Sequence, residues 1–158
     1  MSSEIHQLLS TTGGAQAPFM GKHVHKLDPK KRLTIPSGWR TLIGEDWVFL
    51  MPGIDRACLM LMPGTVMSQF MQKLQGMMLS NPDEMELMLT LASESDHLNF
   101  DVQGRIRVKD EHLAYAGLTG EVILASAFNR IELWSPENWE ARKPHSPGLA
   151  GAAKALKI

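Results

Sequence analysis

Apolar residues recur in two similar patterns along the chain, each with short alternating runs separated by a helix-like stretch. The first pattern begins LDPKKRLTIPSGWRTLIGEDWVFLM, and the second begins FDVQGRIRVKDEHLAYAGLTGEVIL. Asp28 and Arg32 of the first copy stand 73 positions before Asp101 and Arg105 of the second. An internal repeat of this kind indicates two related structural units.

Each copy predicts the order strand, turn, strand, short helix, strand, turn, strand and helix. A Gly-Glu pair precedes the third strand in both copies, at residues 44–45 and 120–121, and the next turn carries Arg56 or Arg130. A two-stranded hairpin is marginal in water, so one copy has too few strands to close a core. We therefore predict an α+β, β-rich fold, in which the two copies form one compact β-barrel with pseudo-twofold symmetry.

The segment between the copies predicts two helices. Val66, Phe70, Leu74 and Met78 recur every fourth position, and the helix that they mark is broken at Asn81-Pro82. A second apolar stripe follows, made of Met85, Met88, Leu89 and Ala92, and Leu87 and Leu91 extend the apolar surface to another face. Two apolar faces indicate two partners, the barrel and a neighbouring subunit, although burial within one monomer fits the pattern equally well.

The chain is therefore divided into five parts. The 44% apolar and 21% charged residues are those of a globular protein, which argues against general disorder. We expect a flexible N-terminal arm over residues 1–19, a first module over 20–65, connecting helices over 66–94, a second module over 95–142 and a flexible C-terminal tail over 143–158.

Charge is nearly balanced overall but is segregated along the sequence. The chain holds 16 basic and 17 acidic residues, yet residues 22–32 carry five Lys/Arg against one Asp, and residues 83–96 carry five Asp/Glu and no Lys/Arg. Cations gathered at a turn neutralise phosphates. We expect Lys30 and Lys31 to project from a hairpin turn, and Arg32 to read guanine or clamp a phosphate from the start of the next strand.

The aspartate four residues before each arginine has a structural role of its own. Asp28 and Asp101 can accept turn N–H groups and preset the direction of the arginine, and Gly104 supplies a positive φ in the second turn. Lys31 occupies the position that corresponds to Gly104, which allows the first turn a different shape.

Metal and catalytic chemistry find little support in the sequence. His23 and His25 form an isolated HxH pattern, without an HExxH or CxxC motif. The single cysteine, Cys58, lies in the apolar run CLMLM, which predicts a buried thiol. Without a GxSxG or Walker motif we assign no catalytic residue, metal, cofactor or small-molecule substrate. The four tryptophans are interpreted as core or helix-packing residues, namely Trp39, Trp47, Trp134 and Trp139.

The motif pair DPKKR…DVQGR, followed by RLTIP and YAGLTGEVIL, resembles the MraZ family of bacterial transcription regulators; GIDRACLMLMP and NRIELWSPENWE resemble its module endings. The resemblance covers residues 18–142 and implies two tandem SpoVT-AbrB-type modules in a double-split β-barrel. It places DNA contacts at Lys30, Arg32 and Arg105, with Lys31 nearby and Gln103 at the position corresponding to Lys30. Lys31 replaces the expected glycine, Pro29 stiffens that turn, and Lys109-Asp110 replaces a common proline.

The same resemblance implies partners and a role. The protein would form a homo-oligomeric ring on repeated promoter boxes in double-stranded DNA, and would act as a repressor of the division and cell-wall gene cluster, including its own promoter. No apolar run approaches the ~20 residues that cross a bilayer, and no secretory pattern opens the sequence, so we expect a cytoplasmic, nucleoid-associated protein without a membrane partner. The alternative is an antitoxin-like protein-interaction module.

Overall fold

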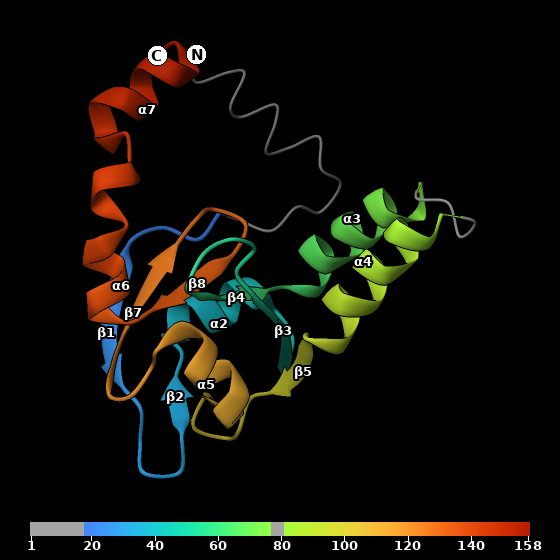
Figure 1. Cartoon of the computed structure of the whole chain (residues 1–158). Helices are drawn as coiled ribbons and strands as arrows, with labels where there is room; N and C mark the ends of the chain where they lie inside the picture. The colour runs from blue at the N-terminus through green and yellow to red at the C-terminus, as the bar shows by residue number, and fades with distance from the viewer. Residues whose placement is uncertain (1–17, 77–80) are drawn as a thin grey trace.

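The computed structural model describes residues 18–76 and 81–158, and within them the order of elements occurs twice (Figure 1). We keep the names module 1 and module 2 for the predicted ranges 20–65 and 95–142. Module 1 contains β1 (Lys22–Lys26), β2 (Arg32–Thr34), α2 (Ser37–Ile43), β3 (Trp47–Pro52) and β4 (Leu59–Met62), and it is followed by α3 (Gly64–Gln75) and α4 (Pro82–Ser93). Module 2 (residues 95–142) contributes β5 (Asp96–Asn99), β6 (Arg105–Arg107), α5 (Asp110–Ala116), β7 (Glu121–Ser126), β8 (Ile131–Trp134) and α6 (Pro136–Ala141).

The two modules exchange their first strands. In the six-stranded sheet the order is β1-β7-β8-β4-β3-β5, so β1 of module 1 pairs with β7 of module 2, and β5 of module 2 pairs with β3 of module 1. The order reads the same when the modules are interchanged, with the Leu59–Leu133 pair at its centre. All of these pairings are antiparallel. The strand order therefore agrees with the predicted repeat of elements.

The remaining strands, β2 and β6, form a separate two-stranded antiparallel sheet. Within the described ranges the strand ladders form these two sheets and no single closed barrel. The α+β class is confirmed, and the barrel stays a prediction.

Both sheets share one apolar core. Leu33 in β2 and Ile106 in β6 are completely buried, in the same cluster as Val48, Leu50 and Leu124 of the larger sheet. Side chains alternate between the faces of a strand, so the neighbours of Leu33 and Ile106 point away from this core. The outer face of the smaller sheet therefore carries Arg32, Thr34, Arg105 and Arg107.

Glycines end the two short helices of the repeat. Gly44 after α2 and Gly117 after α5 adopt left-handed conformations, with φ of 74° and 65°. A residue without a Cβ takes this conformation at little cost, which is why both helices stop there. Gly117 is therefore the equivalent of Gly44 as a helix end.

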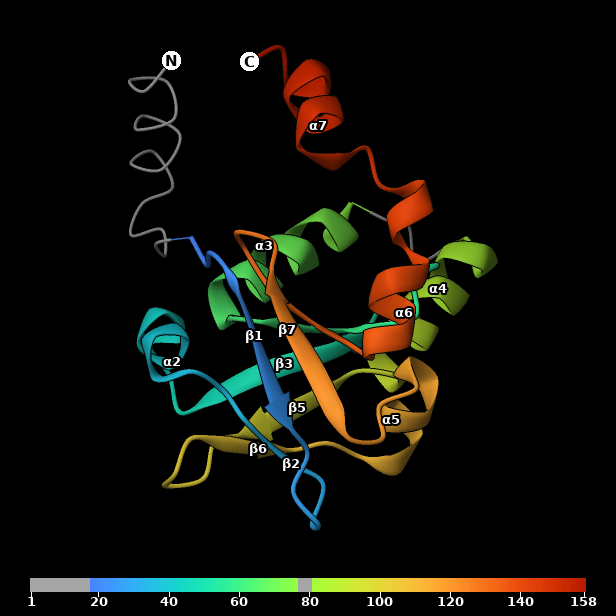
Figure 2. The same cartoon turned by 90° about the vertical axis from the view of Figure 1, so that its left-hand side faces the viewer.

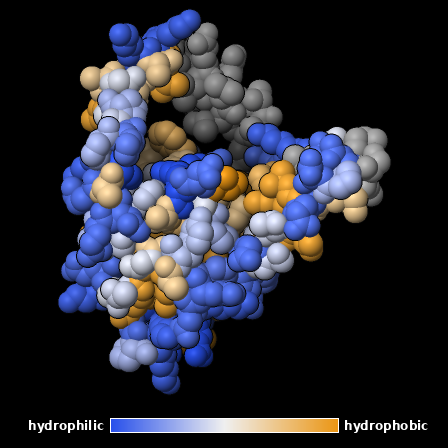
Figure 3. All heavy atoms as spheres, in the orientation of Figure 1, coloured by the Kyte–Doolittle hydropathy of each residue, from blue (hydrophilic) through white to orange (hydrophobic). Residues whose placement is uncertain are grey.

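Helices α3 and α4 pack beside β3 and extend away from the sheet (Figures 1 and 2). The predicted break is confirmed, since Asn81 accepts backbone N–H groups at the start of α4 and Pro82 is its first residue. Met78 lies outside the described residues. Apolar side chains of α4 remain exposed, and hydrophobic surface is visible over this helix pair in Figure 3.

The last stretch of the chain is helical. Residues 143–158, expected to form a tail with at most a short helical turn, contain η1 (Lys143–His145) and the nine-residue helix α7 (Gly148–Leu156). Helix α7 lies at the end of the molecule opposite the β1–β2 turn (Figures 1 and 2). None of the helices described is long and apolar enough to cross a membrane.

Candidate nucleic-acid interface

Two equivalent turns lie at the same end of the molecule (Figure 2). We call residues 28–32 turn 1 and residues 101–105 turn 2; they lead into β2 and β6. Because β2 and β6 pair with each other, Arg32 and Arg105 lie on the same outer face. Arg105 Nη1 is 3.8 Å from Asp28 Oδ2, so the two turns also share an electrostatic contact across the modules.

Turn 1 is held together by Asp28. Its Oδ1 accepts the backbone N–H groups of Lys30 at 2.9 Å and Arg32 at 2.8 Å, and its Oδ2 accepts Arg32 Nε at 2.5 Å. The backbone N–H of Lys31 donates to Asp28 O at 2.9 Å. One carboxylate thus closes the turn and orients the guanidinium that follows it.

Turn 2 repeats these contacts with Asp101. Its Oδ1 accepts the backbone N–H groups of Gln103 and Arg105, both at 2.9 Å, and its Oδ2 accepts Arg105 Nε at 2.8 Å. The backbone N–H of Gly104 donates to Asp101 O at 2.9 Å. The two arginines are therefore held by the same bonding scheme.

Lys31 and Gly104 take the same left-handed backbone conformation, with φ of 62° and 78°. The suggestion that Lys31 would give turn 1 a different shape is wrong. The hydrogen bonds of Asp28 determine the turn geometry, and the lysine backbone adopts a conformation that glycine reaches more cheaply.

The environment keeps both aspartates ionised. Burial acts to raise the pKa of Asp28, but hydrogen bonds from the backbone and side chain of Arg32 outweigh it and lower that pKa below its ordinary value. The backbone N–H of Arg105 lowers the pKa of Asp101, against an opposing effect of burial. At neutral pH each arginine therefore faces a charged acceptor.

Both arginines keep donors available for a ligand. A guanidinium has five N–H donors, and only Nε of Arg32 and of Arg105 is hydrogen-bonded in the described structure. Their side chains are 30% and 23% exposed. A guanidinium that is aimed by a carboxylate and whose Nη groups make no hydrogen bond is suited to bidentate contact with a guanine or a phosphate.

The strand register adds a cation that sequence analysis missed. Arg107 lies directly opposite Arg32 in the β2–β6 pair and is exposed. Like charges placed directly opposite are destabilising, and a polyanion would relieve this repulsion. The alternation Arg105-Ile106-Arg107 could have indicated it, because the two arginines share one face of the strand.

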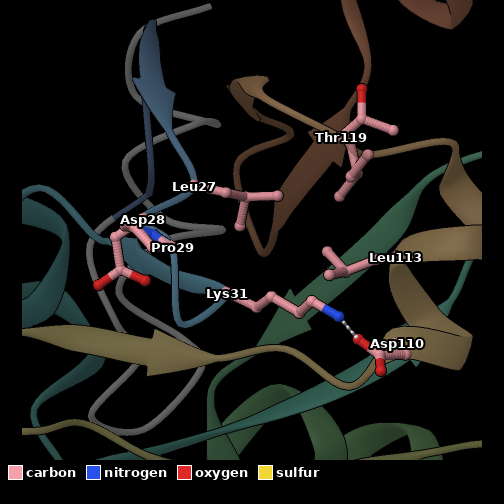
Figure 4. A pocket seen from close by; sticks show the side chains of 8 residues that line it. Leu27, Asp28, Pro29, Lys31, Asp110, Leu113 and Thr119 are labelled. Atoms are coloured by element: carbon pink, nitrogen blue, oxygen red, sulfur yellow. Dashed lines mark hydrogen bonds and ion pairs between the residues drawn. The ribbon is translucent and has the colours of Figure 1, made fainter.

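The other predicted contacts differ in availability. Lys30 and Gln103 are exposed near the tips of their turns, and Lys30 forms no ion pair within residues 18–76 and 81–158. Lys31 instead extends to Asp110 of α5, with which its Nζ forms an ion pair (Figure 4). The Lys31 charge is thus partly neutralised within the molecule.

A hollow of about 610 Å³ lies beside turn 1. It is lined by Leu27, Leu113, Leu118 and Thr119, together with Pro29 and the Lys31–Asp110 pair (Figure 4). Asp28 also lines the hollow, and Lys31 is the one cation of its lining, so the hollow adds no unpaired cation to the interface.

The residues considered for other chemistry are placed elsewhere. Cys58 is completely buried, and burial together with Glu132 raises the pKa of its thiol to about 12. His23 and His25 lie side by side in β1, where burial and then His23 lower the pKa of His25. The described residues hold no group of three or more side chains that could bind a metal ion.

The four tryptophans are all buried at least in part. Trp39 and Trp134 are buried, while Trp47 and Trp139 are half-buried against neighbouring rings.

Comparisons with known proteins agree with the motif evidence. The family model described as "MraZ protein, putative antitoxin-like" matches residues 91–145. The protein named Transcriptional regulator MraZ from Thermomicrobium roseum is 38% identical over 78% of this chain and 86% of its own length. Proteins of the same name from Clostridium acetobutylicum and Clostridium tetani are 32% and 31% identical, over 87% and 77% of this chain and 96% and 84% of their own lengths. The resemblance carried by the two D-x-x-x-R motifs is confirmed, and the chain belongs to the MraZ family.

Proposed function

We propose that this protein is a sequence-specific, DNA-binding transcriptional regulator. One observation carries the proposal: Arg32 and Arg105, each aimed by an aspartate, stand on one exposed face of the β2–β6 sheet. The names of the relatives support the regulatory role. The interface contains no group assigned to catalysis.

The proposed contact places the β2–β6 sheet and its two turns against a major groove. This groove admits a two-stranded ribbon, and an arginine reads guanine there through O6 and N7. Arg32 and Arg105 would read bases, while Lys30, Arg107 and Gln103 would contact the backbone or base edges. Lys31 would contribute only when its pair with Asp110 opens.

The family resemblance supports a more specific role. We propose that the protein represses the division and cell-wall gene cluster, including its own promoter, by binding repeated boxes. It would then be cytoplasmic and associated with the nucleoid. The arrangement of two interlocked modules around one core also supports the double-split barrel as the family fold.

Ring assembly would suit such tandem boxes. Met85 and Leu89 lie on the same face of α4 and are 49% and 60% exposed, which leaves an apolar helix face for a second copy. Joined copies gain affinity through effective concentration, without new contacts within each site. Light scattering should therefore give a mass well above 17.6 kDa, and a concentration-independent monomer would contradict the ring.

The second candidate is an antitoxin-like protein-interaction module. Leu149, Leu156 and Ile158 in and after α7 are 93%, 69% and 66% exposed, as expected for a segment that binds a partner protein. In that case a variant shortened before Pro147 would lose partner binding and keep DNA binding. DNA binding ranks first because it accounts for both turns.

A mobility-shift experiment tests the proposed function. The protein is titrated with a duplex from upstream of its own gene, with one box or with tandem boxes, at several salt concentrations. We expect tighter binding to tandem boxes and a steep loss with salt, with a slope of about −0.9 in log K for each phosphate contacted. Absence of a shift at low salt, or a flat salt dependence, would reject DNA binding.

A further inference from the structure

Arg40 of module 1 lies against turn 2 of module 2. A Cβ atom built on Gly104 would lie 2.2 Å from Arg40 Cζ, 2.4 Å from Nε and 2.6 Å from Nη1. The guanidinium therefore rests on the glycine backbone and leaves no room for a side chain. Helix α2 and turn 2 lie on the same side of the molecule in Figure 2.

Two hydrogen bonds connect the Arg40 side chain to turn 2 through the backbone of Ile35. Arg40 Nε donates to Ile35 O at 3.0 Å, and the backbone N–H of Ile35 donates to Gly104 O at 3.0 Å. The Arg40 side chain is thereby coupled to the position of turn 2. Its Nη groups have no hydrogen-bond or ion-pair partner within residues 18–76 and 81–158, and the residue is partly exposed.

The charge of the two turns makes this placement informative. Turn 1 carries Lys30 and Lys31, whereas the corresponding residues of turn 2, Gln103 and Gly104, carry no charge. Leu113 stands 73 positions after Arg40 and lines the hollow beside turn 1 without a charge. Each turn is thus accompanied by cations, and turn 2 receives its additional cation from the other module.

We propose that Arg40 binds a DNA phosphate beside turn 2, an inference that rests on the proposed DNA-binding function. Its two Nη groups can donate a pair of parallel hydrogen bonds to phosphate oxygens. The contact would fix the register of turn 2 on the duplex and would not select bases. Gly104 is required because any Cβ would displace the guanidinium.

The test compares Arg40→Leu, which copies Leu113, with Arg40→Gln and Arg40→Lys. Arg40→Gln keeps a donor for Ile35 O without the charge, and it serves if the leucine variant does not fold. Arg40→Lys keeps the charge without the planar fork. Lys73→Gln removes one positive charge from α3, away from the turns, and is the matched control.

Fluorescence anisotropy is measured with the upstream duplex and with an unrelated duplex of equal length, across a salt series. We expect Arg40→Leu and Arg40→Gln to lower the affinity for both duplexes roughly tenfold. They should also reduce the slope of log K against log salt by about 0.9 for each Arg40 engaged. Arg40→Lys should keep most of the slope, and Lys73→Gln should resemble the unmodified protein.

Two results would overturn the inference. One is unchanged affinity and slope in the leucine and glutamine variants. The other is weaker binding to the upstream duplex alone with an unchanged slope, which would reduce Arg40 to positioning turn 2. Arg32→Ala and Arg105→Ala separate this failure from that of the proposed function, because both would then still weaken binding. If these two variants also bind normally, the DNA-binding function itself fails.

Discussion

Turn 1 and turn 2 have the same backbone conformation but differ in the chemistry of their side chains. In each, an aspartate accepts two backbone N–H groups and the Nε of the following arginine, and a left-handed residue precedes that arginine. Turn 1 places Lys31 at the left-handed position and pairs it with Asp110 of α5. Turn 2 places Gly104 there and covers it with Arg40 of α2.

The comparison shows which parts of the motif are structural. The aspartate, the arginine and the left-handed conformation occur in both turns, because together they close the turn and aim the guanidinium. The residue at the left-handed position is free to vary when the helix beside it varies too. Lys31 occurs in the turn whose neighbouring helix carries Leu113, and Gly104 occurs in the turn whose neighbouring helix carries Arg40. A side chain at residue 104 and the Arg40 guanidinium cannot occupy the same space.

The largest expected effect comes from removing either aimed arginine. Arg32→Ala and Arg105→Ala should each weaken DNA binding by about 10–100-fold, since a bidentate base contact contributes about 1–3 kcal/mol. Anisotropy titration with the upstream duplex measures this loss, and circular dichroism checks the fold. Equal losses would mean that the turns read DNA equivalently. Unchanged DNA affinity in both variants would contradict the proposed interface.

The next largest effect is expected on the free energy of unfolding, when a side chain is added at Gly104 in turn 2. Gly104→Ala should reduce the free energy of unfolding by about 1–3 kcal/mol, because it forces a Cβ into a left-handed residue and against Arg40. Lys31→Ala is the matched control, since that position already carries a Cβ, and it should change stability by less than about 1 kcal/mol. Urea unfolding at one fixed protein concentration provides both values.

A double variant sharpens this prediction. Gly104→Ala combined with Arg40→Ala should be less destabilised than the sum of the two single variants, because the clash is then absent. Additive losses would mean that Arg40 does not lie on the glycine.

Lowering the pH should remove the stabilising contribution of the aspartate in both turns. The pKa values of Asp28 and Asp101 are lowered in the folded protein, so their stabilising effect is fully present above the ordinary unfolded value of about 3.9. It is lost as the pH falls through the folded values. The double variant Asp28→Asn/Asp101→Asn should therefore lose less stability than the unmodified protein below about pH 4. Parallel pH profiles of urea unfolding would refute this contribution.

The smallest effect is expected at the left-handed lysine. Lys31→Gly removes the cost of a left-handed backbone, about 1–2 kcal/mol, but also removes an exposed ion pair that contributes about 0–1 kcal/mol. The free energy of unfolding should therefore rise slightly. Affinity should change little, because Asp110 already neutralises Lys31. Asp110→Asn releases the lysine and should make the salt slope steeper by up to about 0.9. A clear loss of stability in Lys31→Gly would contradict the left-handed conformation.

Much of this interface follows from local patterns. The spacing of Asp28 and Arg32, repeated in Asp101 and Arg105, predicts both the turn and the contact within it, because all of the bonds span four residues or fewer. The break before Pro82 follows in the same way from a proline and a capping asparagine. Arg107 was overlooked even though strand alternation placed it beside Arg105.

Other features could not be found in this way. The Lys31–Asp110 pair joins residues 79 positions apart, and the contact of Arg40 with Gly104 joins the two modules. The left-handed conformation of Lys31 opposes its intrinsic preference, and the hydrogen bonds of Asp28 impose it.

By itself, the sequence determined the repeat, the alternation of buried and exposed positions, and the two aspartate-closed turns, because each depends on residues near one another in the chain. The tertiary structure decided which module supplies the partner of each strand. It thereby brought Arg32 and Arg105 onto one face and set Arg40 against Gly104. The physical reason is that strand exchange is fixed by long-range backbone pairing and a shared core, and similar local segments do not specify which copy they pair with.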